Sequence, residues 1–416
     1  MFLSRVSAPV PSTPTVEDIF SSALSNLFTD DTQNFHGVPG QSVYYDSPRF
    51  GRISLRIPAH PDDEDVEGRK LFAHYLWNAG VIVADAIESA SASTSASAST
   101  GHNGHDSASA SASVEVSRDD HQDQNDVEWN NRYWDVRGRR TLELGAGTAL
   151  PSLISALSGA KSITITDHPS SPALTMGAIE QNVRDNLHRS KAEATTTEQN
   201  VGDNNLDVNK SRPDPTPEPV SHEQDTTDAG ASSMVEGSDP KSKSNADSPC
   251  KCETDAEISV YGYTWGTSTF YLPSSYGKLA PSQPTAFDRI IVADCLWMPS
   301  QHANLCKTIL HYLEPSNPAS CALVVAGFHT GRSIVRKFFE VATGDYKVEN
   351  ENQEAQHEVE DEGEDEETRA VKGRLRAAEI FEIDTNGVRR SWEPVRPKED
   401  KHMAKRWCVC AVLVRR

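Results

Sequence analysis

Apolar positions near the start of the chain follow two different periods. Apolar and polar residues alternate over 43–45 and over 53–57, with a turn-forming Asp-Ser-Pro between them, which predicts a hairpin. From about residue 68 to 88 apolar residues recur at helical spacing, which predicts an amphipathic helix. Residues 1–40 are rich in Pro and Ser, and we expect them to be loosely held. We therefore assign residues 41–88 to one segment, an N-terminal hairpin followed by a helix.

Beyond residue 139 short apolar runs alternate with amphipathic stretches. The predicted strands are 141–144, 163–166, 258–263, 287–293, 321–326, 378–383 and 407–414, and the predicted helices are 149–158, 173–188, 300–313 and 332–343. Apolar strands that alternate with helices are typical of a mainly parallel sheet covered on both faces. The predicted fold is thus α/β, a doubly wound, Rossmann-like sheet of seven strands.

Three long polar segments interrupt this pattern. Residues 89–128 are Ser/Ala repeats followed by acidic and polar residues, residues 189–257 hold few large apolar side chains, and residues 349–367 hold 11 acidic side chains without Lys or Arg. Such segments cannot bury enough apolar surface to order themselves, so we expect disordered inserts. They carry a net charge of −25 in a chain of net charge −21, so the other 288 residues are slightly basic. The second and third inserts interrupt one folded domain, residues 129–416.

Composition excludes several classes of protein. A pI near 5.1 argues against nucleic-acid binding, which normally requires a basic surface. No apolar run approaches the roughly 20 residues of a membrane helix, and the start of the chain lacks the apolar core of a secretory signal. The 7 cysteines suit a reducing compartment, and their Cys-x-Cys pairs do not have zinc spacing, so we expect no metal. A cytoplasmic protein is expected, with a nuclear location also open.

A glycine loop lies where the first strand of the predicted sheet ends and a helix begins. In a doubly wound sheet this turn is at the ligand-binding edge, and Gly145 and Gly147 allow a tight turn around Ala146. The loop lacks the Lys of a phosphate loop, and Leu150 replaces the third glycine of a dinucleotide loop. Glu143, just before the loop, suits a cationic group instead. S-adenosylmethionine, which has a cationic amine and sulfonium and no phosphate, is the ligand that fits.

Two acidic residues follow neighbouring strands of the predicted sheet. Asp167 ends the second strand, 22 residues after Gly145, where a carboxylate can accept both hydroxyls of a ribose. Asp294 follows the strand 287–293, which we expect beside the glycine-loop strand, and Trp297 would line the same mouth. A surface aspartate at 167 and a helix N-cap at 294 are the structural alternatives.

These pieces resemble the seven-β-strand S-adenosylmethionine-dependent methyltransferases, the class I methyltransferase fold. The resemblance is closer to the family-16 protein-lysine methyltransferases, and within them to the fungal nicotinamide-N-methyltransferase-like branch that includes the methyltransferase of translation elongation factor 1-alpha. The matching segments are Leu76-Trp77-Asn78-Ala79-Gly80, Leu142-Glu143-Leu144-Gly145-Ala146-Gly147, Thr166-Asp167, Tyr263-Thr264-Trp265-Gly266 and Phe287 through Asp294.

The resemblance implies how these segments would bind S-adenosylmethionine. It places Trp77 against the cofactor, Gly145, Ala146 and Gly147 at its methionine end, Asp167 at its ribose, Trp265 over its adenine, and Ala293 in the pocket wall.

The acceptor side departs from the family pattern. Lysine-directed members usually follow the fourth strand with an acid, two residues and Tyr or Phe, whereas this chain has Trp297 three residues after Asp294. Asp294 would hold the acceptor amine and Trp297 would stack against it. Phe328 would narrow the channel as well. His329 is either substrate-facing or a hydrogen-bonded structural residue, and we favour the latter.

Three functions are consistent with the sequence. The leading one is transfer of a methyl group to an amine of a protein, a lysine or an N-terminal amine, with elongation factor 1-alpha as the substrate that the resemblance implies. The second is methylation of a small molecule such as nicotinamide. The third is a non-catalytic module that binds S-adenosylmethionine and docks a partner through the acidic inserts. We expect a monomer that acts on a protein substrate without nucleic acid or membrane. The sequence fixes neither the acceptor nor the degree of methylation.

Overall fold

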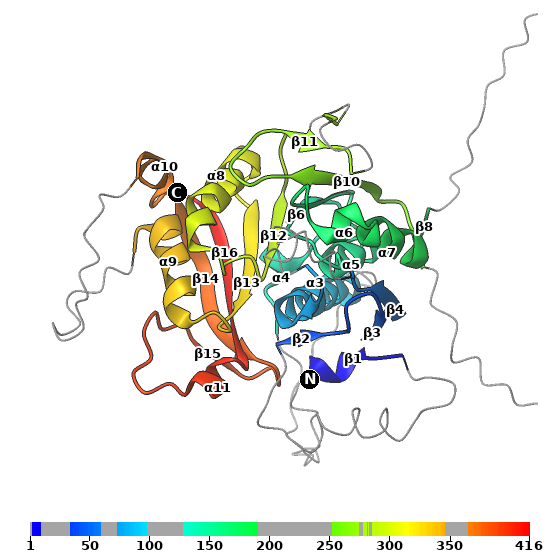
Figure 1. Ribbon diagram of the computed structural model, residues 1–416, viewed down its shortest axis with the longest axis horizontal. Coiled ribbons are helices and arrows are strands. Elements are labelled where there is room, and N and C mark those ends of the chain that lie inside the picture. Colours follow the sequence, from blue (N-terminus) through cyan, green and yellow to red (C-terminus); the bar gives the residue numbers. More distant parts are fainter. Residues whose placement is uncertain are drawn as a thin grey trace, which may run out of the picture. The chain divides into compact units, whose positions relative to one another are not determined.

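The computed structural model describes residues 2–9, 34–59, 73–97, 128–189, 252–273, 278–280, 282, 285–345 and 365–416 (Figure 1). Most of the three expected inserts lies outside the described residues, as do residues 10–33. The described residues all belong to one compact unit, Met1–Ser190 with Pro249–Arg416. Among them no helix has both the length and the apolar composition that a membrane crossing requires.

A nine-stranded sheet forms the centre of this unit, in the order β11-β10-β7-β6-β12-β13-β16-β14-β15 (Figure 1). Its strands are β6 (Arg140–Leu144), β7 (Ser162–Asp167), β10 (Glu257–Tyr263), β11 (Phe270–Tyr271), β12 (Arg289–Ala293), β13 (Cys321–Gly327), β14 (Leu375–Asp384), β15 (Arg389–Ser391) and β16 (Trp407–Arg415). From β10 through β13 neighbours are parallel, and β16 is antiparallel to both β13 and β14.

The predicted α/β fold with a mainly parallel sheet is confirmed. All seven predicted strands are present, six of them run in one direction, and β16 is the reversed one. The strand β12 lies beside β6, the glycine-loop strand, as expected. The sequence analysis did not predict the two short edge strands, β11 and β15, because two or three residues carry no detectable periodicity.

Each face of the sheet is covered by helices and has its own apolar core. α3 (Asn78–Ser97) and α5 (Leu150–Leu157) pack in one core, and α8 (His302–Tyr312) and α9 (Arg332–Thr343) pack in the other. The strand β13 contributes alternately to both, with Leu323 in the first core and Val324 in the second. Successive side chains of a strand point to opposite faces, so a strand covered on both sides must be apolar throughout.

The N-terminal residues form a second, small sheet. β1 (Val6–Ser7), β3 (Ser42–Ser47) and β4 (Gly51–Arg56) are antiparallel, so the predicted hairpin is present. A short 3-10 helix, Leu3–Arg5, precedes β1, and Arg5 pairs with the buried Asp85 of α3. These residues are therefore held by the fold, in contrast to the expectation for residues 1–40.

The predicted helix over residues 68–88 is present only in part among the described residues, which here begin at residue 73. Residues Leu76–Trp77 form β5, which pairs with β2 (Phe35–His36), and α3 starts at Asn78. Leu76 and Trp77 are extended instead of helical because they pair with β2, and the Asn78 amide continues this pairing by donating to the carbonyl of Asn34 at 2.9 Å. At its other end α3 continues to Ser97, into the stretch expected to be disordered, because Ala favours helix.

The remaining boundaries shift by a few residues. Gly177, at φ +67°, divides the predicted helix 173–188 into α6 (Pro172–Thr175) and α7 (Ala178–Asn186). The other short elements are α4 (Asn131–Trp134), β8 (Leu187–Arg189), β9 (Cys252–Thr254), the 3-10 helix Pro299–Gln301, α10 (Glu366–Val371) and α11 (Lys401–Ala404). The ends of the expected inserts therefore contain ordered structure, namely β9, the first residue of β10 and the start of α10.

Candidate functional site

One pocket opens where the parallel strands β6, β7 and β12 end. It holds about 620 Å³ of space, part of it open to solvent. Ten of the residues predicted from the sequence line it: Trp77, Glu143, Gly145, Ala146, Gly147, Asp167, Trp265, Ala293, Asp294 and Trp297. Other lining residues, among them Tyr75, Thr148 and Cys295, stand one or two positions from the predicted ones but have no pattern of their own, so the sequence did not single them out.

The glycine loop is tightly packed against the segment that follows β12. Gly145 and Gly147 have φ values of +67° and +54°, a region that L side chains rarely adopt. A Cβ added to Gly145 would lie only 2.8 Å from Sγ of Cys295. The Cys295 thiol is itself held, because it donates to the carbonyl of Leu144 at 3.2 Å. Glycine at position 145 is therefore required by both conformation and space.

Asp167 joins the end of β7 to the glycine loop. Its Oδ2 accepts the amide of Gly147 at 2.8 Å, and its Oδ1 accepts the amide of His168 at 2.7 Å. Burial raises the pKa of Asp167 above its usual value. Each carboxylate oxygen has two lone pairs, so both oxygens can accept a further hydrogen bond from a ligand in the pocket. The alternative of a surface aspartate is wrong, because Asp167 is buried.

Glu143 is almost fully buried, at 1% exposure, and has a structural partner as well as a place in the pocket lining. Its Oε2 accepts the amide of Ser152, in the first turn of α5, at 3.1 Å. The N-cap of α5, Ala149, provides no side-chain cap, so Glu143 serves instead. Burial raises the pKa of Glu143 to about 8. A cation in the pocket would favour its ionised form.

Asp294 lies at the acceptor side of the pocket in a strained conformation. Its φ is +59°, and its Oδ1 accepts the amide of Gly327, at the end of β13, at 3.1 Å. Burial raises the pKa of its carboxyl. The helix-cap alternative is wrong, because the next helix begins at Pro299 and its N-cap is Met298. Strained non-glycine residues cluster at functional sites, which supports a ligand-binding role for Asp294.

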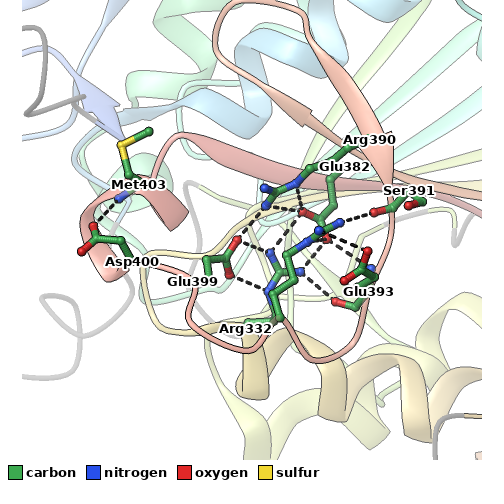
Figure 2. A network of polar contacts seen from close by, with 9 residues as sticks. Arg332, Glu382, Arg390, Ser391, Glu393, Glu399, Asp400 and Met403 are labelled. Atoms are coloured by element: carbon green, nitrogen blue, oxygen red, sulfur yellow. Dashed lines mark hydrogen bonds and ion pairs between the residues drawn. The ribbon is translucent and has the colours of Figure 1, made fainter.

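The turn after β13 differs from the expectation. Phe328 does not line the pocket but lies in the core between α9 and the sheet, stacked on Trp392 with ring centroids 6.0 Å apart. The guanidinium of Arg332 lies 4.0 Å from the ring centroid of Phe328. Figure 2 shows Arg332 held in turn by Glu382 and Glu399. The next residue, His329, lies toward the pocket instead, against Trp77 and Asp294.

The charges of the pocket lining all have one sign. Glu143, Asp167 and Asp294 are lining residues, and the lining that the structure describes contains no Lys, Arg or His. Such a site favours a cationic ligand and disfavours a phosphate. The aromatic rings of Trp77, Trp265 and the neighbouring side chains provide flat apolar surfaces beside these carboxyl groups.

Comparison with curated proteins finds similarity over parts of the chain. The protein N-terminal and lysine N-methyltransferase EFM7 of Gibberella zeae is 23% identical over 208 residues, which cover 50% of this chain and 56% of that protein. The protein of the same name from Schizosaccharomyces pombe is 32% identical over 119 residues, 29% of each chain. The protein N-lysine methyltransferase METTL21A of Danio rerio is 38% identical over 74 residues, 18% of this chain and 32% of that protein.

The chain spans about half or less of the length of these relatives. No family model matches it. A solved structure from Listeria monocytogenes, described as an S-adenosylmethionine-dependent methyltransferase, has a TM-score of 0.28 and 10% identity over 68% of this chain and 93% of its own.

Proposed function

We propose that the protein is an S-adenosylmethionine-dependent methyltransferase that acts on an amine of a protein, a lysine side chain or an N-terminal amine. The observation that carries this proposal is the pocket itself. It combines a glycine loop, three buried carboxyl groups and several aromatic rings, without a cationic side chain in the described lining. The relatives named as protein N-terminal and lysine N-methyltransferases support the acceptor class.

The residues present fit S-adenosylmethionine. A Cβ added to Gly147 would meet only the carbonyl oxygen of Ala73 among the described residues, at 3.9 Å, so a ligand can approach the backbone of the loop there. Glu143 suits the cationic end of the cofactor, Asp167 the ribose hydroxyls, and Trp265 the adenine. Trp77 and Ala293 would complete the walls. When bound, the cofactor supplies a methyl group on a positively charged sulfur.

The protein's own contribution to the reaction is alignment and control of one proton. An ammonium has no lone pair and cannot attack, so the acceptor must first lose a proton. Asp294 would accept a hydrogen bond from the amine and fix its direction, and Trp297 would stack against the carbon chain that carries it. The low exposure of Asp294, 8%, strengthens this contact because water does not compete for the carboxylate.

Within this class we propose elongation factor 1-alpha as the substrate, on the strength of the sequence segments that resemble its methyltransferase. A monomer in the cytoplasm completes the proposal. The state of the cysteines supports a reducing compartment, since Cys295, Cys306, Cys321, Cys408 and Cys410 are all free and buried.

A labelling experiment tests the proposed function. Purified protein, radiolabelled S-adenosylmethionine and an extract of the source organism are combined, and the extract is divided into a desalted macromolecular fraction and a small-molecule filtrate. We expect label in one protein band, identified by mass spectrometry, and its loss in Asp294→Ala. The control Asp46→Asn changes an exposed carboxylate on the hairpin and should transfer normally.

Other outcomes would contradict the proposal. Label found only in the filtrate would indicate a small-molecule methyltransferase of the nicotinamide type. Binding of S-adenosylmethionine without transfer to either fraction, including an extract from cells that lack the enzyme and so hold unmethylated substrate, would indicate a binding module.

A further inference from the structure

His329 lies against the acceptor side of the pocket with one ring nitrogen unused. Its ring stacks on Trp77, with centroids 4.8 Å apart and an interplanar angle of 23°. Its Nδ1 lies 3.7 Å from Oδ1 of Asp294. This nitrogen is buried and has no hydrogen-bond partner among the described residues. Buried polar atoms without a partner are uncommon in folded proteins and often mark a functional position.

The surrounding turn holds the imidazole in this place. Phe328 is fixed in the core by Arg332 and Trp392, and Arg332 is fixed by the carboxylates shown in Figure 2. Because Phe328 occupies the core side of the turn, His329 is left on the pocket side. Gly327 completes the arrangement, since a Cβ at this position would lie 3.1 Å from Nδ1 of His329. The turn therefore leaves room for the ring and little freedom for it to move.

The distance between Asp294 and His329 suits a third group. At 3.7 Å the two atoms are too far apart for a direct hydrogen bond, but one amine nitrogen can lie within hydrogen-bond distance of both. A neutral primary amine that attacks a methyl group has two N–H donors and one lone pair. Since the lone pair must point at the methyl carbon, the donors need acceptors elsewhere. Asp294 can accept one of these donors, and Nδ1 of His329 is placed to accept the other.

We propose that His329 is a catalytic residue that contacts the acceptor amine through Nδ1 and takes the proton that the ammonium must lose. This inference rests on the proposed function. The N–H bond of the ammonium breaks, its electron pair stays on the amine nitrogen, and Nδ1 of His329 receives the proton. The amine lone pair then forms the new N–C bond while the S–C bond breaks and its pair returns to sulfur. After the methylated product leaves, Nδ1 gives this proton to a water molecule that takes the place of the amine, and the ring returns to its neutral form.

The other charged and titratable groups near the ring are not placed to take the proton from the ammonium. Asp294 is the carboxyl that faces the ring from the end of β12. Arg332, three residues on, is engaged by Glu382 and Glu399. The thiols of Cys295 and Cys408 also interact with Asp294, but burial raises the pKa of both well above the usual thiol value, so they stay neutral.

Two substitutions separate proton transfer from packing. His329→Asn places an amide oxygen near the position of Nδ1, so it can accept a hydrogen bond but cannot take the proton. His329→Phe keeps a flat ring against Trp77 and offers no acceptor. His311→Asn is the control, because His311 lies on α8 beside Tyr312 and does not line the pocket. Melting temperature and calorimetric affinity for S-adenosylmethionine are measured for each variant before kinetics.

The assay uses the full-length protein that the wild-type enzyme labels, purified in unmethylated form, from pH 6.5 to 10. We expect His329→Asn to bind S-adenosylmethionine within twofold of wild type and to show kcat about 100-fold lower near pH 7, as for loss of a general base. Its rate should rise about tenfold per pH unit toward the pKa of the free amine, while the wild-type rate levels off earlier. His329→Phe should in addition raise KM for the protein substrate.

The results distinguish this proposal from the proposed function. A wild-type protein that binds the cofactor but labels no protein contradicts both. Normal wild-type transfer with an unchanged kcat and pH profile in His329→Asn overturns the role of His329 alone. A parallel loss of cofactor affinity and rate in His329→Asn, without recovery at high pH, also overturns it, because the ring would then act only by packing on Trp77.

Discussion

Replacing Gly145 with alanine tests what shapes the glycine loop. The φ of +67° costs a non-glycine residue about 1–2 kcal/mol. The new Cβ would also lie 2.8 Å from Sγ of Cys295, closer than real Cβ contacts. The thiol can move away only by giving up its bond to Leu144, and overpacking of this kind costs about 1–3 kcal/mol. We therefore expect Gly145→Ala to lower the free energy of unfolding by roughly 2–5 kcal/mol.

A matched glycine separates the two costs. Gly177 has the same φ of +67°, but a Cβ there would meet nothing within 4 Å. Gly177→Ala should therefore cost only the conformational part, about 1–2 kcal/mol. In the double variant Gly145→Ala/Cys295→Ala the steric part should disappear. The coupling energy of this double-mutant cycle then reports the contact itself, about 1–3 kcal/mol.

Urea unfolding of the four proteins of the cycle and of Gly177→Ala measures these values, with the slope of each transition checked for constancy. Equal losses of stability in Gly145→Ala and Gly177→Ala would refute the reasoning, and so would a coupling energy below about 0.5 kcal/mol between positions 145 and 295. Either result would mean that the loop relaxes away from Cys295 at no cost.

Four further outcomes are expected. Burial raises the pKa of Glu143 from 4.5 to about 8, so the protonated carboxyl contributes its full stability below pH 4.5, and this contribution is lost as the pH rises through 8. The Tm of the wild type should therefore decline over this range, and the decline should be smaller in Glu143→Gln. An equally steep decline in the variant would contradict this assignment. Because a bound cation favours ionised Glu143, binding of S-adenosylmethionine at pH 7 should release a proton from this group. Calorimetry in two buffers of different ionisation enthalpy measures the number of protons released, which should be larger for the wild type than for Glu143→Gln. Asp167→Asn should weaken that binding by about 10- to 100-fold, the value of a charge-assisted hydrogen bond, and unchanged affinity would exclude the ribose assignment. Glu382→Gln removes a fully buried charge that pairs with Arg332 and should lower the free energy of unfolding by about 3–5 kcal/mol, whereas Glu393→Gln, whose side chain is 48% exposed, should cost under about 1 kcal/mol.

The sequence alone was sufficient for seven strands of the sheet and for ten of the residues that line the pocket. Strands covered on both faces must be apolar at nearly every position, which made β12 and β13 recognisable without any knowledge of their neighbours. The glycine loop, Asp167 and Asp294 each follow a strand directly. Since parallel strands end at one edge of a sheet, their order along the chain was enough to predict that these side chains meet.

Local pattern failed where a partner distant in sequence decides the structure. Leu76 and Trp77 fit a helical period, yet they form β5 because Phe35 and His36 are available for backbone pairing. Glu143 was recognised as a pocket residue, but its bond to Ser152 depends on how α5 packs against β6. Neither contact leaves a periodic signal in the sequence.

The turn after β13 shows the same division most clearly. From the sequence, Phe328 was assigned to the channel, and for His329 a structural role was favoured over a substrate-facing one. The structure places Phe328 in the core because Arg332 and Trp392 enclose its ring, and Trp392 comes from a segment more than sixty residues later in the chain. The sequence thus determined which elements form and which edge of the sheet holds the site. Which of two adjacent side chains lies beside Trp77 and Asp294 was decided only by tertiary packing, because it depends on which ring finds partners in the core.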